Sequence, residues 1–324
     1  MMRRVLYALL GMALSFAVFL LAGELLVRLY LIRHTVYDVE MAKYANALKI
    51  DSPNPKIGHL HRPNARARLM NVDVVINSDG FRGPEYRVEK GTASRIIFLG
   101  DSLTLGWGVE EKDAFASLLE ARLGALHPTE VLNFGTGNYN TEQEVNLFLE
   151  KGLKYHPDRV VVFYFINDAE ATPQKSRLWV LGYSRLVTVY WSRFLALRNA
   201  LSPEMSFQGY YSALYRDDQQ GWIHARKAFL ELKAACVQGG MRLQVVLLPE
   251  LHNLAVYPFR REHGLLTAFL NENAIENLDL AASFAGYKSS IDLWVATDDA
   301  HPNARAHKMI ADYTFEFLKR TETP

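Results

Sequence analysis

The sequence has little cysteine: Cys236 is the only one in 324 residues, so no disulfide can form within the chain. No CxxC or HExxH pattern indicates a metal site. The 36 Lys and Arg residues nearly balance the 35 Asp and Glu residues, so a polyanion such as DNA is not an expected partner. The 49% of hydrophobic residues suffices for a large core, which excludes disordered and disulfide-rich scaffolds.

The amino terminus contains a long uncharged segment. Residues 5–23 are nineteen positions without a charge, and a helix of that length spans about 28 Å, close to the hydrocarbon thickness of a bilayer. We therefore expect residues 1–34 to be an uncleaved membrane anchor with residues 5–23 as its span. A cleaved signal peptide and a buried core helix are the alternatives.

The orientation of this anchor rests on few charges. Arg3 and Arg4 on one side are matched in number by Arg28 and Arg33 on the other. The short basic amino-terminal tail favours a single-pass protein with N-in, C-out topology, whose main domain lies in the periplasm or outside the cell.

Beyond the anchor the composition changes twice. Residues 35–93 are polar and turn-rich, which predicts a stalk leading into a short strand at 72–76. From residue 94 to 324, compact apolar runs alternate with helical periodicity. The expected buried strands are residues 95–99, 131–134, 159–166 and 243–248, and the expected helices are residues 113–126, 141–154, 222–238, 259–273 and 302–320. This alternation predicts an α/β fold with a mainly parallel sheet and helices on both faces.

An aromatic-rich insertion at about 170–220 interrupts this alternation, and it contains Trp179, Tyr190 and Trp191. A pair of packing helices is the simplest interpretation. A lid over an apolar substrate, with Trp179 lining the site, and a surface that contacts the bilayer are the alternatives.

Ser102 is the first candidate for chemistry, because it follows the first buried strand in the tetrapeptide Gly100-Asp101-Ser102-Leu103. Reactive groups of α/β sheets gather at the carboxyl ends of the strands. A serine needs a histidine to accept its proton and an acid to orient that histidine.

The sequence Asp298-Asp299-Ala300-His301-Pro302 supplies both partners. Pro302 suits the first turn of a helix, which would place His301 on the loop before it. We expect Asp298, three residues earlier, to fold back and accept a hydrogen bond from the imidazole, with Asp299 as the competing acid.

Two further positions follow strands and carry hydrogen-bond donors. Asn167, after the third strand, provides an amide that suits an oxyanion. The turn containing Gly137 and Asn138, after the second strand, provides a backbone N–H for the same purpose, from either residue. His252, after the fourth strand, is a candidate to line the substrate site.

In this order, the Gly100-Asp101-Ser102-Leu103 tetrapeptide, the glycine-bearing turn, Asn167-Asp168 and Asp298-x-x-His301 resemble the four sequence blocks of the GDSL, or SGNH, hydrolase superfamily. The resemblance implies a flavodoxin-like three-layer α/β/α sandwich. It also implies Ser102 as nucleophile, His301 as base and Asp298 as the acid that orients it. The implied oxyanion hole comprises the Ser102 N–H, an N–H of Gly137 or Asn138, and Asn167. This chemistry needs no metal or organic cofactor.

These inferences lead to a membrane-anchored serine esterase that removes an acyl or acetyl group from a glycan, lipid or small molecule. An O-acyltransferase that modifies a cell-surface polysaccharide is one alternative. A non-catalytic glycan- or lipid-binding assembly factor on the same fold is another. The sequence leaves the acyl group, the alcohol and the oligomeric state open.

Overall fold

A five-stranded, wholly parallel sheet forms the core of the protein. The computed structural model describes residues 1–173, 183–200, 206–287 and 289–320. The strand order is β6-β5-β7-β8-β9. Within this sheet β5 comes first in the chain, and β6, which comes next, forms the edge beside it. This is the flavodoxin-like order, and it confirms the predicted fold class. The strands are β5 (Ser94–Gly100), β6 (Thr129–Asn133), β7 (Arg159–Tyr164), β8 (Arg242–Leu247) and β9 (Glu276–Asp279).

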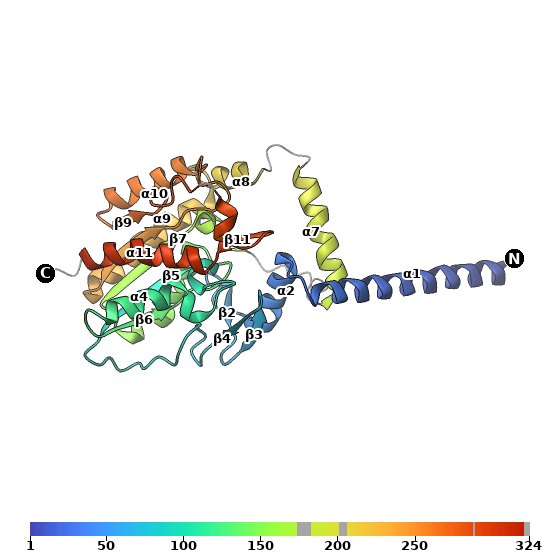
Figure 1. Cartoon of the computed structure of the whole chain (residues 1–324), viewed down its shortest axis with the longest axis horizontal. Helices are drawn as coiled ribbons and strands as arrows, with labels where there is room; N and C mark the ends of the chain where they lie inside the picture. Colours follow the sequence, from blue (N-terminus) through green and yellow to red (C-terminus); the bar gives the residue numbers. More distant parts are fainter. Residues whose placement is uncertain (174–182, 201–205, 288, 321–324) are drawn as a thin grey trace.

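Helices cover both faces of this sheet (Figure 1). On one face α4 and α11 pack together, and on the other α5 packs against α9. The bounds are α4 (Phe115–Gly124), α5 (Thr141–Leu147), α9 (Gln220–Gly239), α10 (Arg260–Glu272) and α11 (Ala304–Arg320). All five overlap the helices expected from the sequence. The fifth strand, β9, was not predicted, because its sequence Glu-Asn-Leu-Asp lacks the apolar run of a buried strand.

Short elements connect these segments. They are α3 (Ser102–Leu105), the 3₁₀ turns η1 (Glu111–Asp113), η3 (Leu153–Tyr155), η4 (Ile166–Ala169) and η6 (Ser290–Leu293), and the π turn η2 (Phe148–Gly152). An antiparallel pair, β10 (Trp294–Ala296) and β11 (Asp299–Pro302), precedes α11. The helix expected from residue 302 begins at Ala304, because Pro302 belongs to strand β11. The Asn303 side chain caps this helix by accepting hydrogen bonds from the N–H groups of Arg305 and Ala306.

Residues 35–93 differ from the expected stalk, because much of this segment packs on the sheet domain. It contains α2 (Tyr37–Leu48) and two antiparallel hairpins, β1 (Lys49–Asp51) with β2 (His59–His61) and β3 (Arg66–Leu69) with β4 (Val72–Val75). A second core cluster joins these elements to α3 and the loop after it, and it includes Tyr44, Leu48, Leu69, Val74, Leu105 and Trp107. The sequence signal missed this packing because the apolar residues of the segment are sparse and lie between turns.

The amino-terminal helix α1 (Met2–Leu31) projects from this body as a separate rod (Figure 1). None of its residues is buried, which is inconsistent with the buried core helix considered above. Its length and composition suit a membrane span, as they also suit a signal sequence. The insertion forms α7 (Arg185–Ala200), beside α1, and α8 (Phe207–Leu214).

Candidate active site

Ser102 lies directly after β5, at the carboxyl edge of the sheet. The chain turns sharply there, and a Cβ on Gly100 would lie 2.0 Å from the Thr104 hydroxyl oxygen, so only glycine fits. Asp101 then caps α3 by accepting a hydrogen bond of 2.8 Å from the Leu103 N–H. Ser102 is fixed in this turn with 6% of its surface exposed.

His301 approaches Ser102 from β11, 199 residues later in the chain. Ser102 Oγ lies 2.8 Å from His301 Nε2, and His301 Nδ1 lies 2.5 Å from Asp299 Oδ1. The acceptor at Nδ1 is a carboxylate, so this nitrogen carries the proton and Nε2 is left to accept from the serine hydroxyl. The three side chains form one continuous line of hydrogen bonds.

The acid in this line is Asp299 and not Asp298, which corrects the expectation from the sequence. Along an extended strand, residues two apart point to the same side, so Asp299 and His301 of β11 share a face. Asp298 lies just before the strand, and its carboxylate accepts instead from the backbone N–H of Tyr37 at 3.3 Å. The expected i to i+3 contact required a turn leading into a helix.

Asp299 is held as a carboxylate by its donors. Burial alone would raise its pKa, but hydrogen bonds from the side chain and backbone of His301 and from Trp107 lower the pKa below its usual range. Trp107 Nε1 donates to the second carboxylate oxygen at 2.8 Å. The structure thus places a buried, ionised acid behind the imidazole.

The turn after β6 places Asn138, rather than Gly137, toward the serine. The Gly137 N–H already donates to Tyr44 Oη at 2.9 Å. Asn138 has a φ of 65° and lines the cavity at Ser102, and its N–H makes no hydrogen bond with the part of the chain that the structure describes. Of the two residues, Asn138 is therefore the one whose N–H is available to an oxyanion.

Asn167 reaches the same cavity from η4, after β7. Its Nδ2 donates to Asp101 Oδ2 at 3.1 Å, which fixes the side-chain amide beside the serine. Burial raises the pKa of Asp101, while the hydrogen bonds from Leu103, Asn167 and Ser102 oppose that effect. The amide retains a second N–H for a ligand.

A cavity of about 370 Å³ opens over Ser102 and His301. Its walls combine aromatic and polar side chains, among them Tyr37, Glu170, Phe207, Tyr211 and His252. The imidazole of His252 contacts the Glu250 carboxylate, and this hydrogen bond raises the pKa of His252 despite partial burial. Trp179, the other expected lining residue, lies outside the described residues.

The segment 35–93 contributes residues that sequence reasoning missed. Tyr37 lies beside the His301 ring, and Tyr44 holds both Gly137 and the His61 imidazole. Lys49 Nζ donates to Asn138 Oδ1 at 2.7 Å. Isolated Tyr and Lys residues in a turn-rich segment carry no pattern that points to a site more than 50 residues away.

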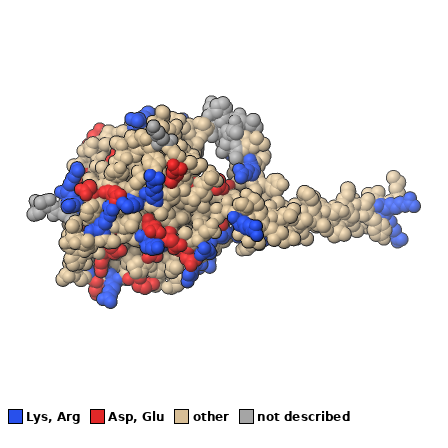
Figure 2. All heavy atoms as spheres, viewed as in Figure 1, with Lys and Arg blue, Asp and Glu red and all other residues tan. Residues whose placement is uncertain are grey.

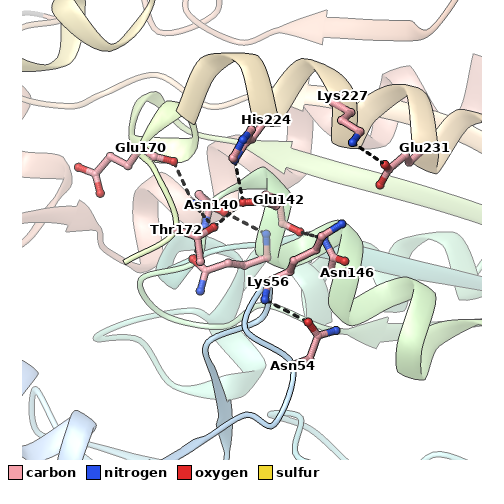
Figure 3. A network of polar contacts seen from close by, with 11 residues as sticks. Asn54, Lys56, Asn140, Glu142, Asn146, Glu170, Thr172, His224, Lys227 and Glu231 are labelled. Atoms are coloured by element: carbon pink, nitrogen blue, oxygen red, sulfur yellow. Dashed lines mark hydrogen bonds and ion pairs between the residues drawn. The ribbon is translucent and has the colours of Figure 1, made fainter. Parts of the chain in front are cut away.

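A network behind the cavity fixes the start of the insertion (Figure 3). Asn140, which caps α5, donates to the Glu170 carbonyl at 2.9 Å and to Thr172 Oγ1 at 3.2 Å. Thr172 in turn donates to Glu142, which also contacts His224 of α9. The backbone of Glu170 is thereby held by the cap of α5, and Thr172 is held by Glu142 of the same helix.

Among the described residues, no group of three His, Cys, Asp or Glu side chains is arranged to hold a metal ion. The cavity itself presents a hydroxyl, an imidazole, carboxylates and amides. Such a set suits nucleophilic attack on a carbonyl carbon.

Comparison with known proteins agrees with this chemistry. A model of the GDSL-like lipase/acylhydrolase family matches residues 98–309. No curated protein sequence matches the chain significantly.

Several solved structures are similar to the chain at low sequence identity. A member of the lipolytic protein G-D-S-L family from Veillonella parvula DSM 2008 is 14% identical, with 70% of this chain and 100% of that chain covered and a TM-score of 0.43. LAE5, an α/β hydrolase enzyme from the metagenome of Lake Arreo, Spain, is 17% identical, with 70% and 95% covered and a TM-score of 0.47. A two-domain esterase (CEX) active on acetylated mannans is 15% identical, with 72% and 50% covered and a TM-score of 0.48.

Proposed function

The chain belongs to the GDSL-like lipase/acylhydrolase family, whose members act on ester bonds, and we propose that it is a membrane-anchored serine esterase with Ser102 as its nucleophile. The observation that carries this proposal is the line of hydrogen bonds from Ser102 through His301 to Asp299. These contacts support the proposal because a serine nucleophile needs a histidine to accept its proton and an acid to orient that histidine.

In the proposed reaction His301 Nε2 accepts the Ser102 proton while Oγ attacks the ester carbonyl carbon. The carbonyl oxygen becomes an oxyanion, which the N–H groups of Ser102 and Asn138 and the Asn167 amide stabilise. Collapse breaks the bond to the alcohol oxygen, and the alcohol leaves with the proton from His301. Water then attacks the acyl carbon while His301 accepts its proton, the bond to Ser102 Oγ breaks, and His301 returns the proton to Oγ as the carboxylic acid is released.

The anchor is part of this proposal. Figure 2 shows a rod whose middle carries no charged side chain, with basic side chains at its free end. In the sequence of α1, Arg3 and Arg4 precede the uncharged segment, and Glu24 and Arg28 follow it. We assign it as an uncleaved span in the N-in, C-out orientation, which places the esterase domain in the periplasm or outside the cell. The substrate is an acyl or acetyl ester of a glycan, lipid or small molecule.

The test is hydrolysis of a water-soluble acetyl ester by the purified full chain, with and without an acceptor glycan. We expect free acetate from the wild type in both conditions, and loss of at least about a thousandfold in kcat for Ser102→Ala and for His301→Ala. Dominant acyl transfer to the glycan would instead indicate an O-acyltransferase. Unchanged cellular function in Ser102→Ala would indicate a binding or assembly factor.

A further inference from the structure

Helix α7 is fastened to the base of α1. The Glu24 carboxylate, on α1, accepts hydrogen bonds from Ser184 Oγ at 2.9 Å, from the Arg185 N–H at 3.1 Å and from the Leu186 N–H at 2.9 Å. Leu186 also packs on Gly23, where an added Cβ would lie 3.3 Å from its Cδ2 atom. The first turn of α7 is therefore tied to one level of α1.

That level is the place where α1 ceases to be apolar. Glu24 is the residue directly after the uncharged segment 5–23, and Arg28 follows one turn later, bonded to both Glu24 and the Tyr183 carbonyl. Figure 1 shows α7 running across the axis of α1 from this point. A helix that crosses the membrane normal at the end of the span lies along the bilayer surface.

The side chains of α7 divide into two faces. Val187, Tyr190, Trp191, Phe194 and Leu197 recur at intervals of three and four residues, so they form one stripe, and each is exposed. The exposed fractions reach 68% for Tyr190 and 56% for Phe194. Thr188, on another side of the helix, is buried, and α7 packs against α1 and α2.

The composition of the exposed face suits a lipid surface. Tyr and Trp are enriched at membrane interfaces, where their rings lie among the acyl chains and their polar atoms reach the headgroups. The exposed side chain of Arg193 adds positive charge for lipid phosphates. An aromatic stripe of this kind facing water would be unfavourable.

We infer that α7 is an interfacial helix whose aromatic stripe inserts into the headgroup region of the same bilayer that α1 spans. This inference rests on the proposed anchor, and it goes beyond it by giving the catalytic body a second membrane contact. The inference also places the cavity near the membrane. Tyr37, in the cavity wall, lies six residues after the end of α1 at Leu31, and six residues span at most about 20 Å when the chain is fully extended.

The test is site-directed spin labelling of the full chain in vesicles of phosphatidylcholine and phosphatidylglycerol. Labels at Tyr190→Cys and Phe194→Cys report on the stripe, Phe16→Cys reports on α1, and Val237→Cys on α9 is an exposed control. The wild type serves as the unlabelled background, because Cys236 is buried and burial raises the pKa of its thiol to about 12. Retained hydrolysis of a soluble ester shows that each variant is folded.

We expect the stripe labels to collide more with oxygen than with a water-soluble nickel chelate, as the Phe16 label does, while the Val237 label shows the reverse. Stripe labels that match the Val237 label, with the Phe16 label in lipid, would overturn the interfacial helix and leave the anchor intact. A Phe16 label exposed to the chelate would overturn the anchor itself. Spin–spin broadening with protection from both reagents would show that a second copy covers the stripe, which also contradicts the inference.

Discussion

Asp299 is linked to Ser102 through the side chain of His301. Its two oxygens are occupied by His301 Nδ1 and Trp107 Nε1, so the carboxylate has one orientation and holds one tautomer of the imidazole. Asp298, next to it in the chain, faces the backbone of α2. Adjacent carboxylates of one sequence motif thus have different environments.

This pair gives a matched test of the proposed acid. Asp299→Asn removes the charge that fixes the imidazole tautomer, and we expect kcat to fall by about ten-thousandfold with the fold retained. Asp298→Asn keeps an acceptor for the Tyr37 N–H, and we expect kcat to change by less than about tenfold. Steady-state hydrolysis of a soluble ester measures both, and the reverse ranking of the two variants would reassign the acid to Asp298.

Asn167 is expected to act on the transition state more than on the bound ester. Asn167→Ala removes one proposed oxyanion donor, and we expect kcat to fall by about a hundredfold to a thousandfold while KM changes little. Measuring kcat and KM separately is essential here. A rise in KM alone would mean that the amide binds substrate without stabilising the oxyanion.

At this scale the sequence predicted Ser102 and Asn167 at one edge of the sheet, because each follows an apolar run typical of a buried strand. It predicted His301 from its position before Pro302 and close to two acidic residues. It missed the acid because the choice between Asp298 and Asp299 depends on whether the backbone at that point is extended or turned. Pro302 favoured the start of a helix, whereas residues 299–302 form the strand β11 because they pair with β10. Tertiary pairing of this kind leaves no local signal.

At the scale of elements, the contact between α4 and α11 contains a buried histidine. His307 of α11 accepts from the Phe115 N–H at 3.1 Å through Nδ1 and stacks on the Phe115 ring. Burial lowers the pKa of His307 to about 3. The imidazole therefore stays neutral in the folded protein at a pH where the unfolded chain binds a proton.

The sign of the resulting pH dependence follows from linkage. Between about pH 6.5 and pH 3 the unfolded state holds the extra proton, so acidification lowers the free energy of unfolding by up to about 1.4 kcal/mol per pH unit from this residue. His307→Gln keeps an acceptor for Phe115 and removes the titration. We expect the stability of wild type relative to the variant to decline with that slope below pH 6.5 in urea unfolding experiments, and to be constant above pH 7.5. A pH-independent difference would mean that the folded protein binds a proton at His307 as readily as the unfolded chain does.

The elements also differ in how well sequence predicts them. The four buried strands were predictable from β-branched and aromatic runs, and α11 from its strong periodicity. The strand expected at 72–76 corresponds to β4. The edge strand β9 and the strands β1, β2 and β3 were not predicted, because each is partly exposed and stabilised by pairing with a neighbour rather than by its own apolar pattern.

In the whole molecule, the family match begins at residue 98, yet the cavity is completed by residues before it. Tyr37 lines the wall, and Tyr44 and Lys49 hold the turn that carries Asn138. The segment between α1 and the sheet is thus part of the candidate site. In the proposed arrangement this segment, which includes α2, connects the membrane-spanning helix α1 to the cavity.

The most direct measurement of the central claim is reaction of the full chain with a fluorophosphonate, followed by mass spectrometry of its peptides. We predict a single phosphonyl adduct on Ser102 in the wild type, a strongly reduced adduct in His301→Ala and none in Ser102→Ala, with all three proteins showing the same circular dichroism. An adduct on another residue, or folded wild-type protein that does not react, would contradict the assignment of Ser102 as an activated nucleophile.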